Sequence, residues 1–168
     1  MNPRILIPAG ISILRIALAF LVFYSFLNNL QLWAISIFVF AVLTDFIDGY
    51  LARKLKASTN WGAYLDTFAD FILILITFTA FAIDGLYPYW LLILILFMYL
   101  QFVLTSGLKK PVYDPLGKYY AALLFISVAI TLILPLNVIC TILLVIIVIF
   151  SLISFLNRFF IIMRRELI

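Results

Sequence analysis

The sequence predicts an all-α integral membrane protein, a bundle of six transmembrane helices with both termini in the cytoplasm. Hydrophobic residues make up 68% of the chain and charged residues only 11%, whereas about a quarter of the residues in a soluble domain are charged. The apolar residues gather in stretches of the length that crosses a bilayer, about 20 residues each. The basic residues are confined to alternate connections between these stretches, which is typical of oriented membrane helices.

The predicted helices fill the chain, because their connections are too short to hold a separate soluble domain. We therefore expect a single domain over residues 1–168. The six stretches lie at residues 8–27, 32–53, 60–83, 90–106, 117–134 and 138–162.

The distribution of lysine and arginine predicts the orientation. All 11 basic residues lie in or near the N-terminus, the second connection, the fourth connection or the C-terminus. The other connections, residues 28–31, 84–89 and 135–137, carry none. Since cytoplasmic loops are enriched in these residues, both termini are expected in the cytoplasm. The net charge of +4 then indicates contact with anionic lipid headgroups, and nucleic acid is not expected as a partner.

The first predicted helix opens with Pro8, a residue type common in the first turn. It then carries Ser12 and Arg15 one turn apart. Two interpretations of Arg15 stand side by side. Its long side chain could snorkel to the cytoplasmic interface, or it could bind an anion.

The second predicted helix ends in a polar face within an otherwise apolar segment. Spacings of i, i+3, i+4 and i+7 place on one side of this helix Asp45, Asp48, Gly49 and Ala52. At 1.5 Å of rise per residue, Asp45 lies about 15 Å from the following loop and Asp48 about 10 Å. Arg53 follows at the rim.

The third predicted helix repeats this pattern with Gly62, Asp66 and Asp70 at i, i+4 and i+8. Helix-capping residue types precede it, so we expect an antiparallel hairpin of the second and third helices with its turn near Ala57. Counting outward from that turn pairs Asp48 with Asp66, and likewise the two remaining aspartates with each other. Four carboxylates are thus expected to meet in a cavity in the cytoplasmic half of the membrane.

Four carboxylates at this depth require positive charge. Each costs roughly 2.5–3.5 kcal/mol on insertion scales, and no cluster of buried lysines is expected nearby, so the charge should come from outside the chain. The chain has no histidine, and Cys140 is its only cysteine. Oxygen ligands without nitrogen or sulfur favour Mg²⁺, Mn²⁺ or Ca²⁺. Two such ions bridged by carboxylates can clamp phosphates during displacement at phosphorus.

The neighbouring small residues and Arg53 fit a phosphate-containing ligand. Gly49, Ala52 and Gly62 leave room for a flat or bulky group, although small residues also allow close helix packing. Both uses can hold at once. Arg53 can pair with phosphate oxygens.

Cations near the fourth, fifth and sixth helices have two interpretations. Lys109, Lys110 and Lys118 could hold an anionic substrate, or they could serve only to orient the chain. Lys118 is the best placed of the three, because it begins the fifth helix beside Gly117 and can point inward. Arg158, in the sixth helix, is a candidate for a phosphate contact.

The spacing Asp45-x2-Asp48-Gly49-x2-Ala52-Arg53-x8-Gly62-x3-Asp66-x3-Asp70 resembles the full signature of the CDP-alcohol phosphotransferase family. The resemblance extends over the whole chain. It is greatest to phosphatidylglycerolphosphate synthases, in the local sequences around Asp48 and Gly62 and at Gly117-Lys118. It implies transfer of a substituted phosphate from a CDP-linked lipid to the hydroxyl of a small alcohol, with release of CMP. It also implies a homodimer in the membrane, with an active site that faces the cytoplasm.

The resemblance assigns roles to individual residues. Two divalent cations, Mg²⁺ or Mn²⁺, would be held by Asp45, Asp48, Asp66 and Asp70. Asp70 would also be the catalytic base that takes the acceptor's proton. The CDP moiety would be bound by Asp48, Gly49, Ala52, Arg53 and Gly62.

The sequence is compatible with several compounds as the acceptor alcohol. The chain departs from the synthases at Phe71, where they carry a lysine, and at residues 98–102, where they carry an Arg-Glu stretch. Glycerol 3-phosphate is the first expectation, with inositol phosphate or another polar alcohol as the alternative. A phosphorylated acceptor would suit Lys109, Lys110, Lys118 and Arg158.

Two other classes of function fit part of this pattern. Facing carboxylates inside a membrane also mark divalent-cation transporters, but no polar ladder continues outward through the last three helices. A purely structural bundle, with protonated aspartates bonded between helices, would leave Arg53, the glycines and the spacing unexplained.

Overall fold

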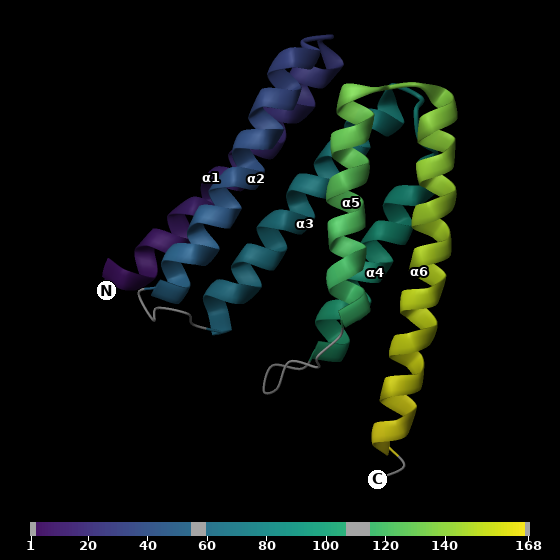
Figure 1. The fold of residues 1–168 in the computed structure, drawn as a ribbon. Helices are drawn as coiled ribbons and strands as arrows, with labels where there is room; N and C mark the ends of the chain where they lie inside the picture. Colours follow the sequence, from purple (N-terminus) through teal and green to yellow (C-terminus); the bar gives the residue numbers. More distant parts are fainter. Residues whose placement is uncertain (1–2, 55–59, 107–114, 167–168) are drawn as a thin grey trace. The chain divides into compact units, whose positions relative to one another are not determined.

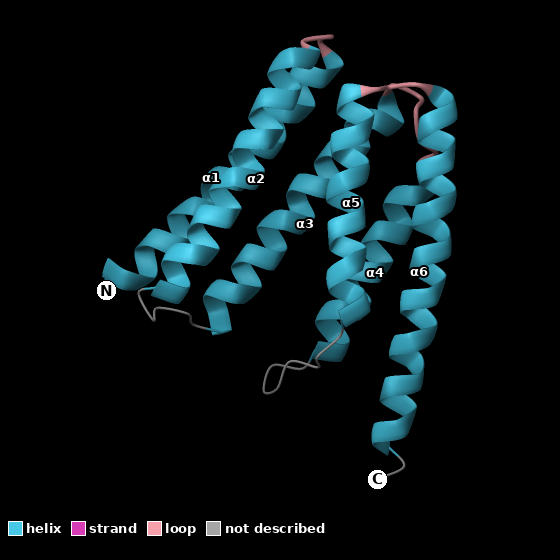
Figure 2. Cartoon of the chain, viewed as in Figure 1, coloured by secondary structure: helices cyan, strands magenta, loops and turns pink. Residues whose placement is uncertain are grey.

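Helices make up all the regular structure in the described part of the chain (Figure 2). The computed structural model describes residues 3–54, 60–106 and 115–166, and it describes side chains for residue 10 and the ranges 12–44, 64–104 and 117–159. In chain order, the helices are α1 (Pro3–Leu27), α2 (Gln31–Lys54), α3 (Asn60–Ile83), α4 (Trp90–Ser106), α5 (Pro115–Ile133) and α6 (Asn137–Glu166). The all-α prediction is confirmed for these residues.

The helix boundaries agree closely with the prediction, except at the two ends of the chain. Both α3 and α4 begin and end where expected. In contrast, α1 begins at Pro3 rather than Pro8, which puts a proline at its first position and another inside its second turn. Proline is favoured at the first position because its missing N–H has no partner there in any case. At the other end, α6 continues to Glu166.

The chain divides into two compact units, Met1–Asp84 and Gly85–Ile168. The first unit holds α1, α2 and α3, which alternate in direction along the chain (Figure 1). Within it, α1 packs along both α2 and α3. The expectation of a single domain over residues 1–168 stays a prediction.

The turn from α1 to α2 is fixed by backbone hydrogen bonds. Asn29 has a positive φ of 59°, a left-handed conformation that asparagine tolerates better than most residues. Its N–H donates to the Phe26 carbonyl at 3.0 Å, and the Leu30 N–H donates to the Ser25 carbonyl at 2.9 Å. This is the Schellman arrangement, which closes a helix by pairing its last carbonyls.

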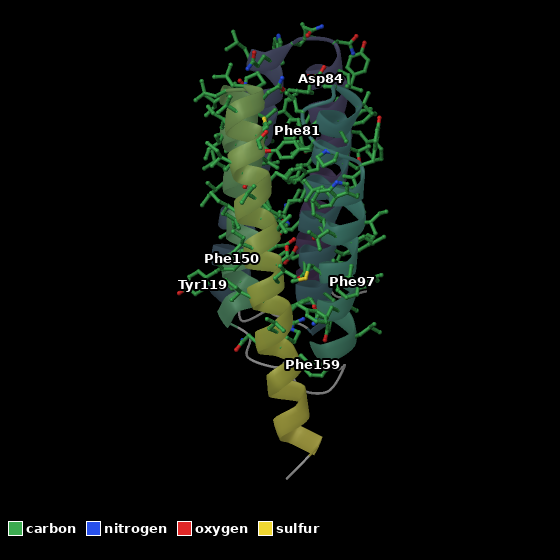
Figure 3. The ribbon with its side chains drawn as sticks, turned by 90° about the vertical axis from the view of Figure 1, so that its right-hand side faces the viewer. Phe81, Asp84, Phe97, Tyr119, Phe150 and Phe159 are labelled. Atoms are coloured by element: carbon green, nitrogen blue, oxygen red, sulfur yellow. The ribbon has the colours of Figure 1, made fainter. Side chains whose placement is uncertain are left out.

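Aromatic packing joins α1 to α3. Phe26 of α1 meets Phe81 of α3 edge to face, with ring centroids 4.9 Å apart. Phe78 approaches Phe81 in the same manner at 5.8 Å, and both α3 rings are fully buried. Figure 3 shows Phe81 and Asp84 towards the end of α3. These contacts hold α1 against α3 at the end of α3 that lies away from its aspartates.

The second unit is organised around α5 and α6, with α4 against α6. Buried hydroxyl groups link its elements. The Tyr87 hydroxyl, before α4, lies 2.9 Å from the Thr131 hydroxyl of α5, and Ser151 of α6 donates to the Tyr120 hydroxyl of α5 at 3.2 Å. Tyr120 also stacks on the Phe150 ring. Such polar pairs are satisfied inside an apolar helix pair.

Two stretches in the described ranges are long and apolar enough to cross a membrane, Tyr64–Ile83 and Asn137–Phe159. Four shorter apolar helical stretches accompany them. The exposed side chains of α6 include the large aliphatic residues Ile142, Val145, Ile146, Ile149, Leu152 and Ile153. Exposed apolar side chains of this kind are suited to lipid.

Candidate active site

Asp66 and Asp70 lie one turn apart on α3, as the i, i+4 spacing requires. Both are half-buried, and the Asp70 side chain keeps 28% of its surface exposed. Ala69 and Phe71, beside Asp70 in the sequence, are buried. Phe71 thus places a buried apolar side chain directly after Asp70.

Helix α1 supplies a hydrogen-bond donor to the first of these carboxylates. The Ser12 hydroxyl donates to Asp66 Oδ1 at 2.6 Å, and Ser12 is only 1% exposed. A hydrogen bond to a carboxylate is shorter and stronger than one between neutral groups. Ser12 therefore fixes one oxygen of Asp66 without changing its charge.

The second carboxylate is held by a buried arginine. Arg15 Nη1 donates to Asp70 Oδ1 at 2.6 Å, an ion pair in which the arginine side chain has no exposed surface. Ser12 precedes Arg15 just as Asp66 precedes Asp70, which fits two helices that run in the same direction (Figure 1). The two contacts together bind α1 to the aspartate face of α3.

This ion pair bears on both interpretations of Arg15. The full burial of the side chain contradicts snorkelling to the interface, and the anion that it binds is a carboxylate of the chain itself. Arg15 thus compensates Asp70 from within the chain, while the expectation that external cations compensate the aspartates stays a prediction. The missed signal was the match between Ser12-x2-Arg15 on one helix and Asp66-x3-Asp70 on another.

The other half of the aspartate motif lies on the last turns of α2. The backbone of α2 stays helical to Lys54, so the i, i+3, i+4, i+7 phase expected for this face is kept. Among the residues of the motif, those that lie outside the side chains described by the structure are Asp45, Asp48, Gly49, Ala52, Arg53 and Gly62. The meeting of four carboxylates between α2 and α3 stays a prediction, and the helix seen to contact both is α1.

The described carboxylates suit a hard divalent cation. Each is hydrogen-bonded by α1 through its Oδ1 atom, and each lies only half-buried. Mg²⁺ and Mn²⁺ prefer such oxygen ligands, commonly with only one or two carboxylates per ion and water for the rest. Among the described side chains, no group of three or more acidic, cysteine or histidine residues gathers at one place.

The candidate acceptor cations of the second unit differ in their surroundings. Lys118 is exposed, and the expectation that it can point towards an acceptor stays a prediction. Arg158 is buried at 4% exposure, with its guanidinium carbon 5.0 Å from the centroid of the Phe102 ring. A cation over an aromatic face is stabilised by the ring quadrupole. Lys109 and Lys110 fall outside the described residues.

Comparison with known proteins gives a consistent result. A family model described as CDP-alcohol phosphatidyltransferase matches residues 5–161. Proteins named CDP-diacylglycerol–glycerol-3-phosphate 3-phosphatidyltransferase are among the relatives. The one from Wigglesworthia glossinidia brevipalpis is 34% identical over 110 residues, which cover 64% of this chain and 60% of that protein.

Two further relatives carry the same name. The protein from Pseudomonas fluorescens is 45% identical over 71 residues, which cover 40% of this chain and 36% of the relative. The protein from Cereibacter sphaeroides is 34% identical over 109 residues, which cover 62% and 49%. The chain thus spans between 36% and 60% of the length of these curated relatives.

Proposed function

The chain belongs to the CDP-alcohol phosphatidyltransferase family, and we propose that it moves a phosphatidyl group from a CDP-linked lipid to glycerol 3-phosphate, releasing CMP. The observation that carries this proposal is the family match over residues 5–161, which includes the two carboxylates bound by α1. The names of the relatives favour glycerol 3-phosphate as the acceptor. Inositol phosphate and other polar alcohols are the alternatives that an assay must separate.

The proposed reaction is a displacement at phosphorus. The acceptor's hydroxyl oxygen forms a bond to the phosphorus of the phosphatidyl group, while the bond from that phosphorus to the CMP oxygen breaks. The electron pair of the broken bond leaves with CMP. Asp70 takes the hydroxyl proton as general base, and its partly exposed side chain leaves it accessible to the acceptor.

The proposed cation ligands are Asp45, Asp48, Asp66 and Asp70, for two ions of Mg²⁺ or Mn²⁺. When bound, the ions supply positive charge that stabilises the pyrophosphate and the departing CMP. The oxygen donor set of Asp66 and Asp70 is of the kind these ions prefer. Ser12 and Arg15 orient the two described carboxylates from α1.

The remaining candidate residues bind the two substrates in this proposal. The CDP moiety is held by Asp48, Gly49, Ala52, Arg53 and Gly62. Arginine is well suited to this role, because its fork of donors matches phosphate oxygens. The phosphate of the acceptor is bound by Lys109, Lys110, Lys118 and Arg158.

We further propose a multi-pass membrane protein whose active site opens to the cytoplasm. The two described helices of spanning length and the alternation of basic connections support this arrangement. A cavity in the cytoplasmic half would let a lipid tail enter from the bilayer while CMP leaves to water. Assembly as a homodimer is proposed on family resemblance.

The experiment that tests the function is CMP release by the purified protein in detergent or vesicles. CDP-diacylglycerol is the donor, with Mg²⁺ or Mn²⁺, and glycerol 3-phosphate, inositol 1-phosphate, inositol, glycerol and serine are supplied separately. We expect release with glycerol 3-phosphate that EDTA abolishes. Release with another acceptor alone would reassign the substrate, and release unaffected by EDTA would remove the cations from the proposal. No release with any acceptor, together with cation flux through vesicles, would favour a transporter instead.

A further inference from the structure

The two polar contacts that α1 makes with α3 have the same length, but their donors differ in charge. Each is a hydrogen bond of 2.6 Å to the Oδ1 atom of an aspartate. Ser12 is a neutral donor, so it brings no positive charge to Asp66. Arg15 is cationic, so Asp70 and its partner together carry no net charge.

From this difference we propose that α1 tunes the two aspartates in opposite directions. Ser12 strengthens the binding of a divalent cation at Asp66, whereas Arg15 weakens it at Asp70 and positions Asp70 to act as the proton acceptor. Arg15 is thus a positioning residue, which acts on the reaction through Asp70. The inference rests on the proposed function in one respect, since it takes Asp66 and Asp70 as cation ligands.

The action of Ser12 follows from how outer hydrogen bonds affect ligands. A neutral donor fixes the orientation of a ligating carboxylate, and loss of such a partner usually lowers cation affinity. Ser12 is almost fully buried, so water does not readily replace its hydroxyl. Removing the hydroxyl therefore leaves Asp66 free to rotate.

The action of Arg15 follows from Coulomb's law. A guanidinium within hydrogen-bond distance of Asp70 repels any divalent cation on the same carboxylate, and burial weakens the solvent screening of this repulsion. Arg15 is fully buried, whereas Asp70 is 28% exposed. Cation and substrate can therefore reach Asp70 while Arg15 stays behind it.

The same pair leaves Asp70 suited to proton transfer. A base must be held within hydrogen-bond reach of the proton it takes, and small misplacements of catalytic groups cost up to about 100-fold in rate. Arg15 holds one oxygen of Asp70 with a single positive charge, half that of a divalent ion. Without Arg15, Asp70 is therefore expected to bind the cation more tightly and to be less available as a base, which would slow turnover.

The test compares Mn²⁺ affinity, measured by electron paramagnetic resonance on the full chain in detergent, with Mn²⁺ alone as the probe. Arg15→Gln should bind Mn²⁺ about tenfold more tightly, whereas Ser12→Ala should bind it roughly threefold more weakly. Ser25→Ala removes another buried hydroxyl of α1 and should leave the affinity unchanged. Equal or weaker binding by folded Arg15→Gln would overturn the proposal, as would absence of Mn²⁺ binding to the wild-type protein.

A second pair of variants keeps the test decisive if Arg15→Gln does not fold. Asp70→Asn alone is compared with Arg15→Gln/Asp70→Asn, in which both charges of the buried pair are removed together, a change that proteins often tolerate. The double variant should bind Mn²⁺ more tightly than Asp70→Asn, because the guanidinium that Asp70→Asn leaves without its counter-charge still repels a cation on Asp66. Equal binding would show that the charge of Arg15 does not act on the cation, and would overturn the proposal.

Turnover separates positioning from a general effect on the fold. Arg15→Gln should lower kcat about 10- to 100-fold with little change in KM for the acceptor, while Arg15→Lys, which keeps the charge, should restore wild-type Mn²⁺ affinity and part of kcat. Loss of Mn²⁺ affinity and kcat together would indicate damage to the fold and contradict the proposal. Normal Mn²⁺ behaviour in all variants without CMP release by the wild type would instead reject the proposed reaction.

Discussion

At the scale of single residues, the feature that changes the interpretation most is the ion pair between Arg15 and Asp70. The sequence shows that buried carboxylates need compensation, and it shows an arginine two turns inside the first helix. Nothing in either local pattern pairs them, because 55 residues separate the two positions. Helical spacing predicts which residues share a face, while the choice of facing helix depends on packing along the whole element.

The role of Asp70 can be separated from that of a simple cation ligand. Asp70→Asn keeps the shape and one oxygen of the side chain but cannot take a proton, so CMP release should fall by at least about 100-fold. Binding of CDP-diacylglycerol, measured by isothermal titration, should remain within a few-fold of wild type. Loss of donor binding along with turnover would make Asp70 chiefly a ligand of the cations.

Lys118 offers a test of acceptor recognition. Its exposed side chain can be shortened with little effect on stability, so Lys118→Ala should act on the substrate alone. We expect KM for glycerol 3-phosphate to rise about tenfold from the loss of a charged hydrogen bond, at an unchanged Mg²⁺ requirement. An unchanged KM would leave Lys118 with a role in orientation only.

At the scale of elements, sequence periodicity and hydropathy predict the helices well. The described boundaries of α3 and α4 match the prediction, because capping residues and turn residues mark them directly. The start of α1 does not match, since a proline at either of two positions could open the helix. The packing of α1 along both α2 and α3 was not predicted, because the spacing argument considered only neighbours joined by a short loop.

The aromatic contact between α1 and α3 is expected to stabilise the packing of these two helices. Phe26→Ala removes a buried ring that meets Phe81 at 4.9 Å, which should cost roughly 3 kcal/mol and lower Tm. Phe20→Ala is the matched control on the same helix, because Phe20 is 59% exposed and its loss should cost less than about 0.5 kcal/mol. Thermal unfolding in detergent measures both. Equal Tm losses would mean that this contact does not hold α1 in place.

The Tyr87 hydroxyl links the connection before α4 to α5, and it predicts a pH dependence. Burial raises the pKa of the Tyr87 phenol, although its hydrogen bond with Thr131 acts in the opposite direction. The unfolded chain, with a tyrosine pKa near 10, therefore ionises first as the pH rises. The stabilisation by the neutral phenol is complete below about pH 10 and is lost above it.

Replacement of the phenol tests this linkage. Tyr87→Phe should lower stability at pH 8 by about 1 kcal/mol through the lost hydrogen bond. Between pH 9 and 11 its Tm should fall less steeply than that of the wild type, since one ionising group is gone. Parallel curves for the two proteins would show that Tyr87 ionises equally in the folded and unfolded states.

At the scale of the whole molecule, the main expectation is that α5 crosses the membrane with its first residue on the cytoplasmic side. Lys118 and Leu136, near its two ends, are both exposed. A cysteine at position 118 should react with a membrane-impermeant maleimide only in inverted vesicles, and one at 136 only in intact cells. Cys140 is fully buried and serves as an unreactive background. Labelling of both positions from one side would rule out this orientation.

The order of the chain gives the contact between α1 and α3 a consequence for biogenesis. In the proposed multi-pass arrangement, helices enter the bilayer from the N-terminus onwards during synthesis, so Arg15 would arrive before Asp70, which follows 55 residues later. A lone carboxylate inside a bilayer costs roughly 2.5–3.5 kcal/mol on insertion scales. With Arg15 already in place, α3 would meet its counter-charge on arrival. In the proposed arrangement, α1 would thus assist the insertion of the segment whose carboxylates it later holds.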